Sequence, residues 1–171
     1  MSAGNVSNDT RLGRKKKPAS LIRTWLFSAR LMMRSGVERL PRLVFDTSAY
    51  SWFRRGGSEV LDLASRAGVV IVPVTVLGEL EAGFQGGTRW KENHHLLQEF
   101  LEEPFVVVLD TTPAVAQRYG EIVGALRKAG TPIPTNDIWI AAATFDCAGH
   151  LLTFDEHYSS VDGLPATILR P

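Results

Sequence analysis

Short, mainly apolar runs alternate along most of the chain with longer segments that have helical periodicity. Five such runs occur, at residues 43–45, 69–72, 105–109, 150–153 and 166–169. Strands that are apolar throughout, rather than at alternate positions, are typical of parallel sheets covered on both faces. We therefore predict an α/β fold with three layers, in which a short, mostly parallel sheet has helices on both faces.

The clearest helical pattern covers residues 113–128. Thr112 can cap this helix, Pro113 suits its first position, and Gly130 is placed to end it. The apolar stripe that should face the sheet consists of Val115, Tyr119, Ile122 and Leu126. A helix of this length between two apolar runs supports the alternating strand and helix order.

Composition narrows the class of protein. With 171 residues, 44% of them hydrophobic and 22% charged, the chain has the size and composition of one globular domain. No apolar run approaches the ~20 residues of a membrane-spanning helix, so we expect no membrane partner. The single Cys147 excludes an internal disulfide and a cysteine-based zinc site, and it fits a reducing cytoplasm.

Charge divides the chain at about residue 42. Residues 1–42 carry ten Lys or Arg and two acids, a net +8, whereas residues 43–171 carry nine against sixteen, a net −7. We expect a basic extension at 1–42, disordered and then forming a short amphipathic helix, before one domain at 43–171. The extension could contact RNA, a membrane surface or a partner. It could equally lack a function, be a transit peptide, or reflect a true start at Met32 or Met33.

Four carboxylates stand at the ends of predicted strands or the beginnings of predicted helices. Asp46 follows the first strand and Glu79 lies in a helical segment after the second. Asp137 lies at the start of a later helix, and Asp155 follows the fourth strand. Each acid could simply be a turn or cap residue. The carboxyl ends of parallel strands meet at one edge, however, so we expect one acidic pocket, which suits Mg²⁺ or Mn²⁺.

The residues alone leave some alternatives open. Glu79 and Glu81 are ~200° apart around a helix, so only one of them can face the pocket, and periodicity does not choose. Thr153 could hydrogen-bond a metal-bound water or a ligand carboxylate. His94 and His95 are adjacent and give no ligand pair, and no P-loop, GxGxxG or GxSxG motif is present. These absences exclude nucleotide-binding, Rossmann and α/β-hydrolase classes.

Four segments resemble, in this order, the PIN-domain ribonucleases and most closely the VapC toxins of bacterial type II toxin-antitoxin pairs. The segments are LVFDTSAYSWFRRG, VTVLGELEAGF, PIPTNDIWIAAAT and LLTFDEHY. The acidic positions and the hydroxyl of the family fall on Asp46, Glu79, Asp137, Asp155 and Thr153. The resemblance thus favours Glu79 over Glu81. Phe154 departs from the pattern, because many relatives have a basic residue there.

The resemblance implies a PIN-like fold and a Mg²⁺-dependent endoribonuclease that acts as the toxin of a toxin-antitoxin module. The five matched residues would be catalytic, with Asp46 and Asp137 as principal metal ligands completed by Glu79 and Asp155. Products with 5′-phosphate and 3′-hydroxyl ends, a tRNA or rRNA loop as substrate, a VapB-like antitoxin and a homodimer are also implied. The main alternative is a non-catalytic PIN-fold protein that binds RNA or has a regulatory role. Receiver, phosphatase and DNA-nuclease classes fit the acid pattern less well.

Binding of RNA by an acidic domain requires a local basic rim. Arg54 and Arg55 follow the first acidic segment, and Arg89 follows the second. We take these three arginines as candidates for substrate binding, with an ordinary solvated surface as the alternative for each.

Overall fold

The structure, a computed structural model, describes residues 42–170. Their strands form one five-stranded sheet in the order β3-β2-β1-β4-β5, and every neighbouring pair is parallel. The strands are β1 (Leu43–Phe45), β2 (Val70–Pro73), β3 (Val106–Leu109), β4 (His150–Thr153) and β5 (Ala166–Ile168). The predicted α/β fold is therefore confirmed. The disordered stretch and amphipathic helix predicted before residue 42 lie outside the described residues.

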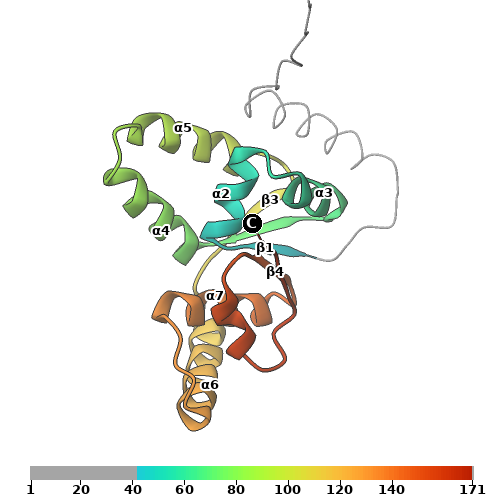
Figure 1. Cartoon of the computed structure of the whole chain (residues 1–171), viewed down its shortest axis with the longest axis vertical. Coiled ribbons are helices and arrows are strands. Elements are labelled where there is room, and N and C mark those ends of the chain that lie inside the picture. Colours follow the sequence, from blue (N-terminus) through green and yellow to red (C-terminus); the bar gives the residue numbers. More distant parts are fainter. Residues whose placement is uncertain (1–41, 171) are drawn as a thin grey trace, which may run out of the picture.

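Helices cover both faces of this sheet (Figure 1). Their bounds are α2 (Thr47–Arg55), α3 (Ser58–Arg66), α4 (Val74–Gln85), α5 (Trp90–Leu101), α6 (Pro113–Ala129) and α7 (Thr135–Asp146), followed by the 3₁₀ helix η1 (Glu156–Ser160). Figure 1 shows α2 to α5 on one side of the sheet, with α6 and α7 on the other. Right-handed crossovers explain this division, because the chain moves outward from β1 to β3 and then returns past β1 to β4. In the described part of the chain, no helix has the length and apolar character needed to cross a membrane.

The clearest sequence-predicted helix has the caps expected of it. The Thr112 hydroxyl accepts a 3.3 Å hydrogen bond from the backbone N–H of Val115, and Pro113 is the first residue of α6. Gly130 ends the helix in the left-handed conformation, with φ at 71°. These end signals act locally, which is why sequence alone located the helix to within one residue.

The core is built on the three central strands. Residues of β1, β2 and β4 are almost all buried, whereas the edge strands β3 and β5 are partly exposed. The rings of Phe45, Phe53 and Phe100 pack together with centroids 5.1–6.3 Å apart and join β1 to α2 and α5. Strand order reverses between β1 and β4, and sheets of this kind form a crevice at the carboxyl ends of such strands. Asp46 directly follows β1 at this point.

Gly149 allows β4 to lie against β1. A Cβ added at Gly149 would come 2.6 Å from Cγ2 of Val44 and 2.9 Å from Sγ of Cys147, both of them buried. We expect Gly149→Ala to lower the free energy of unfolding by about 1–3 kcal/mol, because this overpacking forces a backbone shift. Gly124→Ala on α6 is the matched control, since a Cβ there meets nothing within 4 Å and should stabilise the helix by up to about 1 kcal/mol. Urea unfolding measures both variants, and equal stability would contradict the expectation.

Candidate active site

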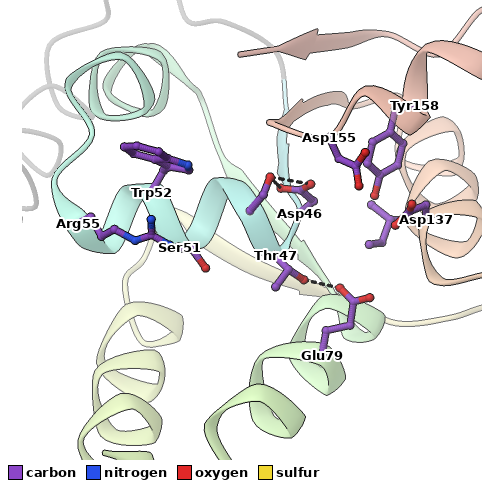
Figure 2. Close-up of a pocket in the computed structure, with 11 residues that line it drawn as sticks. Asp46, Thr47, Ser51, Trp52, Arg55, Glu79, Asp137, Asp155 and Tyr158 are labelled. Carbon is purple, nitrogen blue, oxygen red and sulfur yellow. Dashed lines mark hydrogen bonds between the residues drawn. The ribbon is translucent and has the colours of Figure 1, made fainter. Parts of the chain in front are cut away.

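A pocket of about 340 Å³ opens at the carboxyl ends of the central strands (Figure 2). Its lining consists of Asp46, Thr47, Ser48, Ser51, Trp52, Arg55, Glu79, Asp137, Ile140, Asp155 and Tyr158. All four acids expected from the sequence are in this set, although they come from four separate segments. The structure therefore brings them to one place, as the expectation of a single acidic pocket required.

Asp46 is fixed where β1 passes into α2. Its side chain caps α2 by accepting a 2.7 Å hydrogen bond from the backbone N–H of Ala49. The Ser48 hydroxyl donates to Oδ1 at 2.7 Å, and the Thr153 hydroxyl donates to Oδ2 at 2.5 Å. Only 4% of Asp46 is exposed, and burial raises the pKa of its carboxyl although these hydrogen bonds oppose the rise. Of the two roles open to Thr153, the hydrogen bond to a carboxylate is the one observed.

Glu79 reaches the pocket from α4. The Thr47 hydroxyl donates a short hydrogen bond to Oε2, and the Asn136 amide donates to Oε1 at 2.8 Å. Glu81 instead lies 2.7 Å from Nδ1 of His94 and is not among the residues that line the pocket. The choice between the two acids was open on periodicity, and the geometry agrees with the choice that the resemblance favoured.

Asp137 lies in the first turn of α7. Burial raises the pKa of its carboxyl to about 6, and the nearby carboxylates of Asp155, Glu79 and Asp46 add to the rise, while His157 opposes it. The Oδ2 atom is buried and has no hydrogen-bond partner among the described residues. A buried carboxylate oxygen without a donor is costly unless a cation or a proton compensates it.

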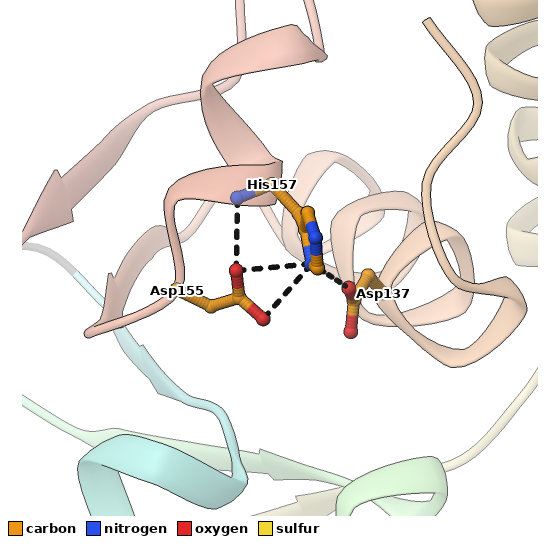
Figure 3. Close-up of side chains that lie close together, drawn as sticks. All are labelled: Asp137, Asp155 and His157. Carbon is orange, nitrogen blue, oxygen red and sulfur yellow. Dashed lines mark hydrogen bonds and ion pairs between the residues drawn. The ribbon is translucent and has the colours of Figure 1, made fainter.

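The side chains of Asp137, Asp155 and His157 lie close together (Figure 3), and the two acids line the pocket. Asp155 caps η1 by accepting a 2.9 Å hydrogen bond from the backbone N–H of His157. The Nδ1 atom of His157 lies 3.0 Å from Oδ1 of Asp155 and 3.4 Å from Oδ2 of Asp137. His157 was not predicted from the sequence, because it joins two acids rather than a second histidine.

These residues fit a divalent cation. Asp137, Asp155 and His157 each offer one ligand atom, and the three atoms lie within 4.8 Å of one another. Oδ2 of Asp137 accepts no hydrogen bond from the described residues and has only Nδ1 of His157 at 3.4 Å, so a cation would satisfy this buried oxygen. Carboxylate oxygens suit Mg²⁺ and Mn²⁺, while the imidazole widens the choice toward transition-metal ions. Asp46 and Glu79 lie outside this compact group but line the same pocket.

Two aromatic residues that the sequence did not indicate, Trp52 and Tyr158, also line the pocket. Tyr158 is only 2% exposed, and burial together with the four acids raises the pKa of its phenol well above the ordinary value. Its hydroxyl therefore stays protonated beside the carboxylates. Trp52 lines the opposite end of the pocket (Figure 2). Both residues have the pattern of ordinary core positions, so no sequence signal separated them from the core.

The three arginine candidates differ in position. Arg55 lines the pocket, with its guanidinium carbon 5.2 Å from the centroid of the Trp52 ring. Arg54 and Arg89 are described residues too, but neither belongs to the pocket lining. Arg55 is therefore the arginine whose place best suits contact with a ligand in this pocket.

The family profile described as PIN domain matches residues 43–164. None of the curated proteins compared with the chain matches it by sequence. Solved structures with a similar fold include VapBC-1 from nontypeable Haemophilus influenzae, with a TM-score of 0.67 at 20% identity, covering 74% of this chain and 97% of that chain.

Two further structures give the same result. VapBC2 from Rickettsia felis, bound to a DNA fragment from its promoter, has a TM-score of 0.65 at 20% identity and covers 74% of this chain and 98% of that chain. VapBC-5 from Mycobacterium tuberculosis has a TM-score of 0.59 at 24% identity and covers 76% and 98%. At these identities the likeness establishes the shared fold, and function has to be argued from the site.

Proposed function

Because the chain belongs to the PIN-domain family, we propose that it is a metal-dependent endoribonuclease and the toxin of a toxin-antitoxin pair. The observation that carries the proposal is the convergence of Asp46, Glu79, Asp137 and Asp155 on one pocket, from four segments distant in sequence. A merely structural role would not require four carboxylates to share a pocket, since their mutual repulsion opposes folding.

The residues divide into cation ligands and residues that orient them. Asp46 and Asp137 are the principal ligands in this proposal, and Asp155 and Glu79 complete the site. Thr153 is held in the interior, fully buried, and its hydrogen bond fixes the direction of the Asp46 carboxylate. Thr47 and Asn136 do the same for Glu79. Such orienting partners reduce the rearrangement that ligand binding would otherwise require.

The proposed reaction is hydrolysis of an RNA phosphodiester. The oxygen of a water forms a bond to phosphorus, the bond from phosphorus to the 3′ oxygen breaks, and that oxygen takes up a proton. The products carry a 5′-phosphate and a 3′-hydroxyl. A bound Mg²⁺ or Mn²⁺ supplies positive charge beside the phosphoryl oxygens and lowers the pKa of water. The pocket carboxylates hold the cation and accept the proton that the attacking water loses.

Metal dependence is the first test of this function. We expect the chain to cleave an RNA that contains a tRNA or rRNA loop in Mg²⁺ or Mn²⁺, to lose this activity in EDTA, and to recover it when excess metal is added. Mg²⁺ should also raise the melting temperature at pH 7.5 and much less at pH 5, because Asp137 holds a proton below about pH 6. Cleavage that persists in EDTA would contradict the proposal.

The alternative function is RNA binding without cleavage. It would be favoured if the chain bound the RNA in Mg²⁺ or Mn²⁺ and left it intact under every metal condition. No feature of the described residues favours this alternative over catalysis, because the ligands of the proposed cation are all present in the pocket.

A partner protein and a second copy of the chain belong to the same proposal. A VapB-like antitoxin is supported by the pocket's four carboxylates, which suit the basic side chains of an inhibitory segment. Co-expression with a small neighbouring reading frame, followed by purification of the complex and measurement of its mass, tests the antitoxin and the homodimer together. A cytoplasmic location is proposed with them, since an RNA-cleaving toxin meets its substrate there.

A further inference from the structure

We propose that Trp52 and Arg55 form a subsite for one unpaired nucleotide of the substrate, with its base on the indole and its phosphate at the guanidinium. The inference rests on the proposed function and extends it, because it names the two residues that hold one base and one phosphate of the substrate. Its evidence is the geometry of the pocket at the end opposite Asp137, shown in Figure 2.

The indole of Trp52 is held by an aromatic neighbour. Its ring stacks on Phe154 with centroids 5.1 Å apart and an angle of 22° between the planes. The backbone N–H of Phe154 donates a 2.9 Å hydrogen bond to the Ser48 hydroxyl, which in turn donates to Asp46. The ring is therefore oriented by the same network that orients an acid. It is partly exposed and lines the pocket, with the Arg55 guanidinium over it.

Arg55 provides the positive charge of this end of the pocket. It is the one Arg or Lys among the residues of the pocket lining, and it is exposed. Its guanidinium lies over the Trp52 ring and makes no ion pair with any carboxylate in the described part of the chain. An exposed arginine in this state can turn from the ring to a phosphate oxygen at little cost, and its planar group suits a phosphate.

An unpaired base is the ligand that fits this pair of residues. Base stacking on an aromatic side chain needs the flat face of the base, which a duplex conceals between neighbouring pairs. The acids at the other end repel phosphate, so a nucleotide next to the cleaved bond has its favourable contacts at Trp52 and Arg55. An arginine of a partner peptide is the competing occupant. It would have to lie beside Arg55, and the repulsion between two like charges disfavours it.

The chain contains a matched control for this subsite. Trp90 is 41% exposed, and Nζ of Lys91 lies 5.6 Å from the centroid of its ring. This second pair of an indole and a cation lies on α5, outside the pocket lining. The pair Trp90 and Lys91 therefore repeats the composition of the subsite without its position.

The experiment compares cleavage of a single-stranded RNA oligonucleotide by the full chain and four variants. Trp52→Leu should lower kcat/KM by about 5- to 100-fold, mainly through KM, as expected for the loss of one stacked base. Arg55→Gln should weaken binding and reduce its salt dependence by about one ion, without loss of folding, since the residue is exposed. Trp90→Leu and Lys91→Gln should stay within about twofold of the unchanged chain.

An abasic nucleotide, moved along the oligonucleotide, tests the contact directly. At one position the abasic nucleotide should lower the kcat/KM of the unchanged chain by the same factor as Trp52→Leu does. It should not lower the kcat/KM of the Trp52→Leu variant any further. The subsite would be overturned if the abasic nucleotide and Trp52→Leu lowered kcat/KM independently of each other. It would also be overturned if Trp52→Leu and Arg55→Gln both cleaved RNA like the unchanged chain. Binding of an arginine-rich peptide that depends on Trp52, while RNA binding does not, would likewise overturn the subsite.

A binding assay separates this inference from the proposed function. Anisotropy of a labelled single-stranded oligonucleotide is measured in EDTA, where no cleavage is expected. If the unchanged chain binds through Trp52 but never cleaves RNA with any metal, the proposed endoribonuclease fails and the nucleotide subsite stands. If the chain cleaves RNA and Trp52→Leu equals the Trp90→Leu control in both assays, the subsite fails and the endoribonuclease stands.

Discussion

Asp46→Asn should lower the rate of RNA cleavage in Mg²⁺ by at least about 100-fold and leave the fold intact. Loss of a residue that merely orients a metal ligand usually costs 10- to 100-fold, and Asp46 is proposed as a ligand itself. Asparagine keeps an oxygen that can accept from the backbone N–H of Ala49, so the cap of α2 survives. Removing one of four clustered charges also relieves their repulsion.

A matched control for this variant is Asp146→Asn. Asp146 is the last residue of α7, is exposed, and lies outside the pocket lining, so the change removes the same charge at a different place. Single-turnover cleavage, circular dichroism and a Mg²⁺ titration are measured for both variants. A folded Asp46→Asn protein that cleaves RNA at the unchanged rate, in a preparation free of host nucleases, would remove Asp46 from the site.

Asp137→Asn should make the chain more stable in EDTA above pH 6 while it abolishes cleavage. The Asp137 carboxyl has a pKa of about 6 in the folded chain, raised from 3.8 mainly by burial. Between these two values the folded chain binds more protons than the unfolded chain, so its stability falls as pH rises. A pKa difference of this size lowers the free energy of unfolding by roughly 3 kcal/mol at most, and the variant should regain part of this stability above pH 6.

Urea unfolding at pH 4, 5, 6, 7 and 8 measures this prediction. The difference in unfolding free energy between Asp137→Asn and the unchanged chain should be small at pH 4, grow up to about pH 6 and then stay constant. Asp146→Asn at the other end of α7 should show no such growth. An Asp137→Asn protein that is less stable than the unchanged chain at pH 8 would show that the carboxylate is satisfied without a cation.

Local sequence signals predicted the parts of the fold that depend on neighbours along the chain. Strands β1 and β4 begin and end where the apolar runs do, and α6 has the Thr112 cap and Gly130 end expected of it. Periodicity and cap chemistry act over a few residues, which makes them readable without coordinates. The same signals gave no bounds for α2, α3 or α5.

The candidate site likewise has residues that the sequence indicated and contacts that only the structure showed. Asp46 at the end of an apolar run and Asp137 near a helix start were visible as acids at suggestive places. The contact of His157 with Asp137, and the stacking of Trp52 on Phe154, were not. Each of these contacts joins residues that are far apart in the sequence. In the sequence, His157 resembles an ordinary surface position and Trp52 an ordinary core position.

The amino-acid sequence by itself determined which segments become strands, that these strands are apolar enough for a covered parallel sheet, and which acids lie at their ends. Only the tertiary structure decided that β4 lies beside β1 and that His157 lies between two acids. It also turned Glu79 rather than Glu81 toward the pocket, a choice that periodicity left open and the resemblance favoured. The physical reason is that secondary structure follows from interactions between near neighbours, whereas a site depends on strand order and side-chain direction, which the packing of the whole domain selects.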